Sequence, residues 1–546
     1  MPVSNDISQQ SQASQHSTGP TLGWRELAIQ RPTPRERRRR RTLGILGVLL
    51  LITIVFAGVR LAAITTTIND QLDVHIGSQQ VITLDLRQGL PISPTIMGAN
   101  VSPRLGTTSL DNVNGFMDYS PPLTAGLVAA HVKLLDFPGG NWGEDHYLSH
   151  DQLTAFVTLL AQVHADGIVQ TRLSGPLNGN FQALTDLTAR ANVAAKWVDF
   201  MNNPHSDQRI GKYAQAPFYP IKYWTVGNEP DKLINPATGR LYTVAEYVHD
   251  FIQFSTIMHH ADPTIKVLGP EISEFYGPGA GPTDANGQLW MEGFLKGVGA
   301  YEKAHNVTLL DGVSFHRFQF ANATQTPYTF LSSTGEWNYL LPALNQLISQ
   351  DLPSGLPIAL TAINTSPPHQ AAPSRGLAAL WWADTLGTLM NQQVGYVAFS
   401  SASGSTQPYP LFTTTGQQPT PMFRVMELFS HLSHDLIPLE VERDPMSTYA
   451  TQDAKHQSVS LLFVNKAATG QFVQITSNKN LFGASPWHNL NVNIPGYSIV
   501  VLTLHRNAGA EAYSFAVPTD NNTNTAPIIH TICGTQTNTT VNATIC

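Results

Sequence analysis

The sequence of 546 residues predicts an α/β fold, namely a (β/α)8 TIM barrel with an accessory antiparallel β-sandwich, preceded by one transmembrane helix. Three observations predict this fold. An apolar segment near the N-terminus has no ionisable side chain, eight short β-type runs alternate with helix-like stretches, and the C-terminal part carries alternating runs without helical spacers. A chain of this length accommodates one large barrel and an additional module.

The composition limits the class of protein. A formal net charge of −7 is small for this length and argues against a nucleic-acid-binding protein, which has a basic domain or stripe. Hydrophobic residues make up 42% of the chain, so disorder throughout is excluded. The two cysteines, Cys533 and Cys546, are too few for a disulfide framework or a dense structural zinc site.

The N-terminal segments predict a membrane topology. Residues 1–41 are expected to be a disordered basic tail in the cytoplasm, and residues 42–64 a transmembrane signal-anchor helix. Thr42 to Val59 carry no ionisable side chain and rise about 27 Å as a helix, enough to cross the bilayer core. The arginines before this segment predict a cytoplasmic N-terminus and extracytoplasmic main domains. A cleaved signal peptide is the alternative, although its apolar core is usually shorter.

The barrel is expected in residues 91–430, after a linker and a strand in residues 65–90. Helix-like stretches with apolar residues at three- and four-residue steps separate the strand candidates. Reactive groups of such barrels sit at the C-terminal ends of the strands. The eight strand candidates are 93–101, 132–140, 168–175, 221–230, 265–273, 311–320, 357–365 and 395–403.

The sandwich is expected in residues 431–506, where short alternating runs follow one another. The early strand at 80–88 is predicted to join it, so that both ends of the barrel contribute. Residues 507–546 are rich in Asn and Thr and are predicted to be a flexible tail. An exterior location permits a disulfide between the two cysteines of this tail.

The segment Tyr223 to Pro230, YWTVGNEP, places Asn228 and Glu229 at the end of the fourth strand. This Asn-Glu pair resembles clan A of the glycoside hydrolases. The resemblance extends over roughly residues 80 to 505 and is similar to the arabinofuranosidase-like, family 39 and heparanase-like branches. Further motifs that carry it are GANV (98–101), FPGGN (137–141), SFHRF (314–318) and PGYSIVVLTL (495–504).

The resemblance implies that Glu229 is the general acid/base and that Asn228 binds the sugar 2-hydroxyl. An acid role requires a raised pKa for Glu229. A retaining enzyme of this clan also needs a second carboxylate about 5–5.5 Å away as the nucleophile. It is expected at the end of the seventh strand, where this chain has Ala362. A methyl group neither attacks a sugar nor carries charge, so the nucleophile position is lost.

Other departures from the family pattern agree with this loss. The family usually has an Arg, a Tyr and a Trp that support the nucleophile or the sugar. At the matching positions this chain has Asp136 for the Arg, Phe318 for the Tyr, and Ser400 or Ser401 for the Trp.

A displaced carboxylate is an alternative source of catalysis. Asp136 and Glu271 are the candidates for a base in an inverting scheme, which tolerates a gap of about 6.5–9.5 Å. For Asp136 the favoured interpretation is a structural ion pair with Arg172 on the neighbouring strand. For Glu271 it is a structural contact or a contact to a sugar hydroxyl.

Three more residues are candidates for carbohydrate binding. His316 fits either a substrate contact or a hydrogen-bonded core histidine. Trp142 and Tyr147 are able to stack on sugar rings, although aromatic residues in such loops often only pack. No metal and no cofactor are predicted, because the sequence has no HExxH, P-loop or Rossmann motif and its histidines show no ligand spacing.

Two classes of function follow. The first is a membrane-anchored extracytoplasmic glycoside hydrolase-like protein that acts on oligo- or polysaccharide, with carbohydrate and the membrane as partners and no nucleic acid. The second is a catalytically silent carbohydrate-binding or cell-envelope scaffold protein. Ala362 favours the second class, because loss of a nucleophile costs many orders of magnitude in rate. The retained Asn228 and Glu229 favour the first.

Overall fold

The computed structural model describes residues 80–544, with gaps. Residues that it does not describe within this range are 87–88, 104–118, 147, 175–183, 320–325, 354, 368–371, 404–408, 414–415, 442, 478–488, 508, 519–524 and 536–542. The predicted tail 1–41 and the predicted helix 42–64 lie outside the described residues.

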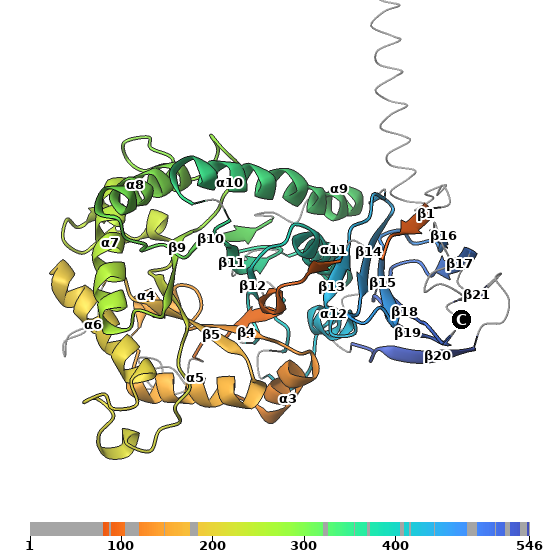
Figure 1. The fold of residues 1–546 in the computed structure, drawn as a ribbon, viewed down its shortest axis with the longest axis horizontal. Helices are drawn as coiled ribbons and strands as arrows, with labels where there is room; N and C mark the ends of the chain where they lie inside the picture. The colour runs from red at the N-terminus through yellow and green to blue at the C-terminus, as the bar shows by residue number, and fades with distance from the viewer. Residues whose placement is uncertain are drawn as a thin grey trace, which may run out of the picture. The chain divides into compact units, whose positions relative to one another are not determined.

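Eight parallel strands close into a barrel, which confirms the predicted architecture (Figure 1). Their order around the barrel follows the chain, and each strand candidate of the sequence overlaps one of them. Seven of the candidates contain the whole strand, and the candidate 168–175 begins two residues after β5 does. The strands are β3 (Gly98–Asn100), β4 (Leu134–Phe137), β5 (Asp166–Thr171), β6 (Tyr223–Val226), β9 (Lys266–Ile272), β10 (Gly312–Phe318), β11 (Ile358–Asn364) and β12 (Tyr396–Phe399).

Helices alternate with these strands. Two of them, α5 and α7, begin at capping boxes in which Ser149 pairs with Gln152 and Thr243 with Glu246. The helices are α3 (Pro121–Ala129), α4 (Trp142–Asp145), α5 (His150–Val163), α6 (Leu187–Asn202), α7 (Val244–Ala261), α8 (Trp290–His305), α9 (Pro327–Ser332), α10 (Trp337–Asp351), α11 (Arg375–Asn391) and α12 (Pro421–Phe429). Short 3-10 turns are η1 (Pro94–Ile96), η2 (Gly211–Tyr213), η3 (Pro230–Lys232) and η4 (Ser333–Glu336), and a small hairpin pairs β7 (Ile234–Asn235) with β8 (Arg240–Leu241).

The barrel interior is apolar at one end and polar at the other. Buried residues from the N-terminal parts of the strands, including Leu134, Ile168 and Leu268, form a small cluster of their own. Further along two of the same strands, Asp136 and Glu271 are also buried. Buried carboxylates need partners, so the C-terminal ends of the strands are where a polar site is expected.

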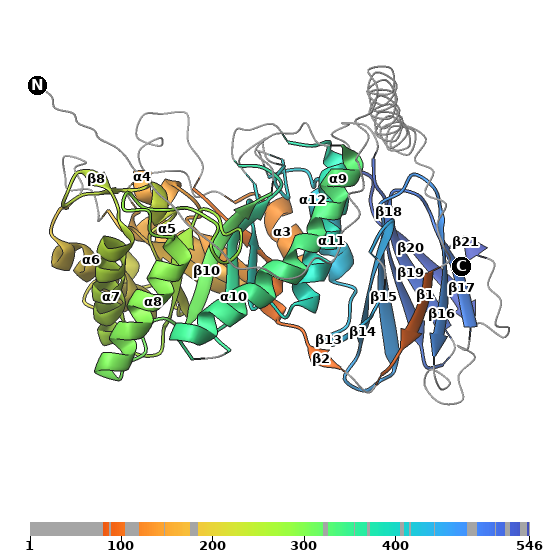
Figure 2. The same ribbon diagram turned by 90° about the horizontal axis from the view of Figure 1, so that it is seen from above.

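Two packed sheets form the sandwich, and strands from before the barrel enter both of them (Figure 2). The predicted joining of the early strand is confirmed, because β1 pairs with β16 in parallel. The smaller sheet has the order β1 (Gln80–Leu84), β16 (Gln471–Ser477), β17 (Asn489–Ile494) and β21 (Ala543–Thr544). The larger sheet has the order β2 (Leu90–Pro91), β13 (Asp435–Ile437), β14 (Met446–Gln452), β15 (Ser458–Asn465), β18 (Ser498–His505), β19 (Gly509–Ala516) and β20 (Ile529–Thr535).

The strands β19 and β20 correct the prediction of a flexible tail over residues 507–546. Strand β19 pairs with β18 from Ala510 to Ala516 and buries Ala512 and Phe515. The Asn- and Thr-rich composition of the last forty residues conceals this pattern. In β20, Cys533 is disulfide-bonded, and Cys546, the other cysteine of the chain, lies outside the described residues.

A buried ion-pair cluster joins the barrel to the sandwich. Asp384 of α11 lies 3.1 Å from the Lys466 ammonium and 3.3 Å from the Arg443 guanidinium, and it accepts a hydrogen bond of 2.6 Å from the Tyr449 hydroxyl. Burial alone raises the pKa of Asp384, but the two cations outweigh it and lower that pKa. Helices α11 and α12 also pack against β15 and β18 (Figures 1 and 2). The barrel and one face of the larger sheet therefore share a core, and a second apolar cluster lies within the sandwich.

The structure contradicts the predicted localisation. Among the described residues, no helix combines the length and the apolar character needed to cross a bilayer. The prediction of a single-pass membrane protein with extracytoplasmic main domains rested on residues 42–64, and it is not supported by this finding.

Candidate active site

Two carboxylates stand at the C-terminal ends of neighbouring barrel strands, held by unusual backbone conformations. Glu229 follows β6 and has φ of 47°, and Glu271 in β9 has φ of 61°. Residues other than glycine rarely adopt this left-handed backbone conformation, and those that do cluster at functional sites. The Glu229 N–H donates to the Glu271 carbonyl oxygen at 2.9 Å, which fixes the two strand ends to each other.

The His316 imidazole bridges these two carboxylates. Its Nδ1 lies 3.2 Å from Oε1 of Glu229, and its Nε2 lies 3.1 Å from Oε2 of Glu271. The side chain is only 3% exposed. Burial alone lowers the pKa of His316, but the hydrogen bonds to both carboxylates outweigh it and raise that pKa to about 10. At neutral pH the ring is therefore a cation that donates from both nitrogens.

Glu229 has a second cationic partner. Its Oε2 accepts a hydrogen bond of 2.9 Å from the Lys232 ammonium, three residues further in the same turn. Burial favours a raised pKa, but His316 and then Lys232 outweigh it and lower the pKa of Glu229 to about 2. The upward shift expected for a general acid is therefore wrong for this arrangement, because both partners stabilise the ionised carboxylate.

The Glu271 side chain, on β9, extends past the neighbouring strand β10 to the seventh strand, β11. Its Oε2 also accepts a hydrogen bond of 2.8 Å from the Thr361 hydroxyl. Its Oε1 is buried and has no hydrogen-bond partner among the described residues. A buried carboxylate oxygen without a partner is costly and is uncommon in native proteins. This carboxylate therefore lies inside the barrel with one acceptor unused.

Asp136 of β4 belongs to the same cluster. Its Oδ2 accepts a hydrogen bond of 2.6 Å from the Asn100 amide, which also donates to the Thr361 carbonyl oxygen at 2.8 Å. Burial and the charge of Glu271 raise the pKa of Asp136 well above its usual range, against the charge of His316. The Asp136 carboxyl therefore keeps its proton more readily than an ordinary aspartic acid does.

The predicted ion pair between Asp136 and Arg172 is wrong. Arg172 follows β5 and donates to the Ser174 hydroxyl at 2.8 Å and to the His146 carbonyl oxygen at 3.1 Å. It also lies close enough to Glu144 for the two charges to affect each other's pKa. Because the Arg172 side chain follows the loop at the strand end, it does not enter the barrel interior where Asp136 lies.

Ala362, which the sequence predicts to replace the nucleophile, lies in β11. It pairs in register with His316 on β10, and it is buried. Its neighbour Thr361 is the residue that donates to Glu271. At this position the seventh strand therefore contributes only the methyl group of Ala362. The carboxylate that contacts this strand is that of Glu271, from the fifth strand.

The binding residues predicted from the sequence differ in their surroundings. Asn228 is buried and donates to the Asn141 side-chain oxygen at 2.7 Å, so the FPGGN turn orients it. Trp142 stacks on His146 with 4.8 Å between ring centroids, and its indole N–H is buried without a partner among the described residues. Packing rather than sugar stacking describes Trp142 best. The side chain of Tyr147 lies outside the described residues.

Four residues that contact the predicted site residues were given no role from the sequence. Asn100, Asn141, Lys232 and Thr361 all donate to or accept from the predicted residues. A signal existed for Lys232, which follows Glu229 by three residues and so falls on the same side of a tight turn. Thr361 gave no such signal, because its partner is ninety residues away in sequence.

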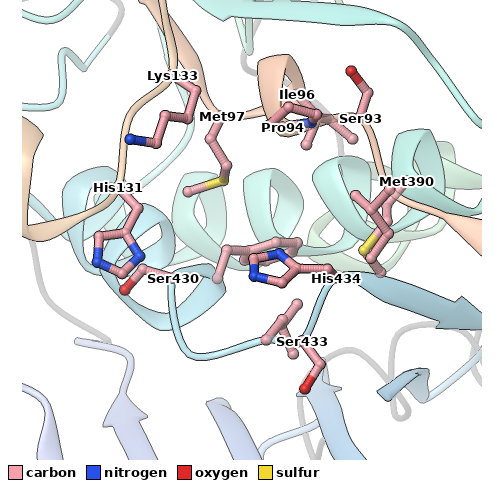
Figure 3. Close-up of a pocket in the computed structure, with 13 residues that line it drawn as sticks. Ser93, Pro94, Ile96, Met97, His131, Lys133, Met390, Ser430, Ser433 and His434 are labelled. Atoms are coloured by element: carbon pink, nitrogen blue, oxygen red, sulfur yellow. The ribbon is translucent and has the colours of Figure 1, made fainter. Parts of the chain in front are cut away.

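A separate pocket of about 150 Å³ lies at the other end of the barrel (Figure 3). Met97 and Lys133, which line it, come directly before β3 and β4. Phe429 and His434 line it from the segment that leads into the sandwich. None of the carboxylates described above borders this pocket, so it is distinct from the candidate active site.

Comparison with known proteins agrees with this geometry. Residues 168–321 match the model of glycoside hydrolase family 44, and this range contains Asn228, Glu229, Glu271 and His316 but not Ala362. The resemblance is to clan A of the glycoside hydrolases. Family 44 is not among the clan A branches named from the sequence, whereas the arabinofuranosidases are. No protein with curated annotation matches the chain in sequence.

Solved structures of clan A enzymes share the fold. A family 44 xyloglucanase from Paenibacillus polymyxa, solved with xyloglucan, has a TM-score of 0.58 at 12% identity and covers 78% of this chain and 100% of its own. A family 51 α-L-arabinofuranosidase from Thermotoga petrophila has a TM-score of 0.60 at 17% identity, covering 84% and 96%. The α-L-arabinofuranosidase from Thermotoga maritima, solved with arabinose, has a TM-score of 0.59 at 15% identity. The match covers 83% of this chain and 95% of that enzyme.

Proposed function

We propose that this protein binds carbohydrate at the C-terminal end of its barrel and does not hydrolyse it by the two-carboxylate retaining mechanism. One observation carries the proposal. A single buried imidazolium, His316, holds both Glu229 and Glu271, while the seventh strand offers Ala362.

The chemistry follows from this arrangement. A retaining hydrolase needs a protonated acid and an ionised nucleophile about 5–5.5 Å apart. Glu229 keeps its charge at neutral pH, because its pKa is lowered to about 2, and Ala362 has no carboxylate. The proton that an acid would deliver is held on His316, which faces two carboxylates and is almost fully buried.

The same groups suit a binding site. The Glu229 side chain is 12% exposed and the Lys232 side chain is 59% exposed. Asn228 directly precedes Glu229 in the sequence. A carboxylate accepts hydrogen bonds from sugar hydroxyls and an ammonium donates to them. The xyloglucanase with the same fold was solved with xyloglucan, which makes neutral plant-type oligosaccharides the first ligands to test.

A second candidate is an inverting hydrolase, and Asp136 favours it. Its pKa is raised well above the usual range, so the site contains one carboxyl that keeps its proton close to the ionised Glu229. In this reading Asp136 supplies the acid, and Glu229 or Glu271 activates water.

The experiment measures turnover and binding on one preparation of the full chain. Aryl glycosides of several sugars report hydrolysis, and calorimetry with oligosaccharides reports binding. Saturable binding without turnover supports the proposal. Turnover that Glu229→Gln or Asp136→Asn abolishes refutes it in favour of the inverting hydrolase. Absence of both refutes it as well and leaves a structural scaffold.

A further inference from the structure

An exposed tyrosine stands in the loop that follows the fifth barrel strand. Tyr276 is 55% exposed, whereas the preceding Phe275 is buried and packs edge-on against Phe315. Gly277 follows with φ of 109°, a backbone conformation that glycine adopts at little cost. The loop is therefore anchored on one side of Tyr276 and turns sharply on the other.

A cation fixes the tyrosine ring from one face. The Arg317 guanidinium carbon lies 4.9 Å from the ring centroid of Tyr276. Arg317 in turn donates to Glu336 at 3.0 and 2.8 Å and to Glu274 at 2.9 Å. A guanidinium with both carboxylates in place has little freedom left, so the tyrosine ring beside it is pre-organised. More than half of the Tyr276 surface is nevertheless exposed and can be reached by a ligand.

The tyrosine lies next to the Glu229 turn. Asp231 of this turn accepts hydrogen bonds from the N–H of Ser273 at 2.9 Å and from its hydroxyl at 2.5 Å, which ties η3 to the loop of Tyr276. The charge of Lys232 also acts on the Tyr276 hydroxyl. Lys232 also donates to Glu229, so the tyrosine hydroxyl and this carboxylate both lie within electrostatic reach of the same ammonium.

We propose that Tyr276 is a stacking platform for one ring of a neutral oligosaccharide, adjacent to the ring that Asn228 and Glu229 contact. This inference rests on the proposed carbohydrate-binding function. Aromatic faces bind the apolar C–H faces of sugars, and an exposed, braced ring does so at low entropic cost. Trp142, a stacking candidate in the sequence, has one face covered by His146.

Charge pairing argues for a neutral ligand. Glu274 and Glu336 neutralise Arg317, and Glu229 neutralises Lys232, so the cations around the platform are already paired. An acidic sugar would bring an additional negative charge next to three carboxylates. A neutral sugar meets only hydrogen-bonding groups and the tyrosine face.

The test compares affinities of full-length variants for neutral oligosaccharides, derived from xyloglucan and from cellulose, by calorimetry. Tyr276→Ala is expected to weaken binding roughly 3- to 10-fold, the contribution of one stacked ring. Tyr276→Phe keeps the ring and is expected to bind within about twofold of the natural protein. Tyr339→Ala removes a tyrosine that is 80% exposed on α10 and is expected to change nothing.

The outcomes separate the platform from the function on which it rests. If Asn228→Ala abolishes binding and Tyr276→Ala leaves it unchanged, the platform is refuted and the binding function survives. If the natural protein binds none of the sugars, the function fails and the platform fails with it. Tighter binding of galacturonate oligomers than of neutral ones would overturn the neutral ligand class. Thermal melting of each variant establishes that it is folded.

Discussion

The Thr361 hydroxyl donates a hydrogen bond of 2.8 Å to the carboxylate of Glu271, from the residue directly before Ala362. A carboxylate of the fifth strand thus reaches the part of the barrel where a clan A enzyme is expected to place the nucleophile of its seventh strand. The two positions differ in one respect that matters for chemistry. Glu271 is buried and paired with a cation, and a nucleophile must be free to reach a sugar.

Introducing the missing carboxylate is not expected to restore hydrolysis. Ala362→Glu adds a buried acid beside His316 and near Glu271, and we expect it to lower stability by about 2–4 kcal/mol. Turnover of aryl glycosides is expected to remain undetectable, because Glu229 is still ionised. Ala362→Gln, of the same size without charge, is the control. Turnover by the Glu variant alone would contradict the prediction.

The His316 cluster predicts a stability that depends on pH at both ends. The folded pKa of His316, about 10, lies above its ordinary 6.5, so its contribution is complete below 6.5 and is lost as the pH rises towards 10. The folded pKa of Glu229, about 2, lies below its ordinary 4.5, so its contribution is lost as the pH falls from 4.5 through 2.

His316→Gln tests this dependence, because it removes the charge and keeps hydrogen-bonding groups. Unfolding free energies from urea titrations across both pH ranges are expected to fall less steeply in the variant than in the natural protein. Equal slopes would show that His316 is neutral in the folded protein.

The cluster between barrel and sandwich predicts a large effect of one substitution. Asp384→Asn leaves the Lys466 ammonium, whose side chain is 4% exposed, without its most buried partner. Breaking such a buried pair is expected to cost about 3–5 kcal/mol in the free energy of unfolding. Asp151→Asn breaks the exposed pair with Lys212 and serves as the control, with no measurable change. Similar effects of both variants would contradict the prediction.

The orientation of Asn228 predicts an effect on affinity without one on the fold. Asn141→Ala removes the oxygen that accepts the Asn228 amide at 2.7 Å. Sugar affinity is expected to fall roughly 3- to 10-fold, and the melting temperature is expected to change little, because one hydrogen bond contributes about 1 kcal/mol. A loss of thermal stability as large as that of Asp384→Asn would identify Asn141 as a purely structural residue.

The sequence predicted the barrel well because its signal is local. Each strand is a short apolar run such as Ile358–Asn364, and the spacing between such runs is typical of βα units. It also placed Asn228 and Glu229 correctly at the end of the fourth of the eight strands.

The charge states and ion pairs of the site could not be predicted from local sequence patterns. The pKa of Glu229 depends on His316, 87 residues away, and the partner of Asp136 is Asn100 rather than the expected Arg172. Neighbouring strands bring many charges together, and the direction of each side chain at a strand end decides which of them meet. Composition misled in the last forty residues, where pairing with β18 makes a strand from a segment without a strong apolar run.

The pairing of β1 with β16 has a consequence for the order in which the chain folds. Gln80 lies opposite Val473, so the strand must wait for almost four hundred residues to be synthesised before its partner exists. Contacts of such high sequence separation form late, and an unpaired strand invites wrong partners in the meantime. During synthesis on the ribosome the barrel is therefore expected to assemble first, and the sandwich closes only when the strands from β13 onwards have emerged.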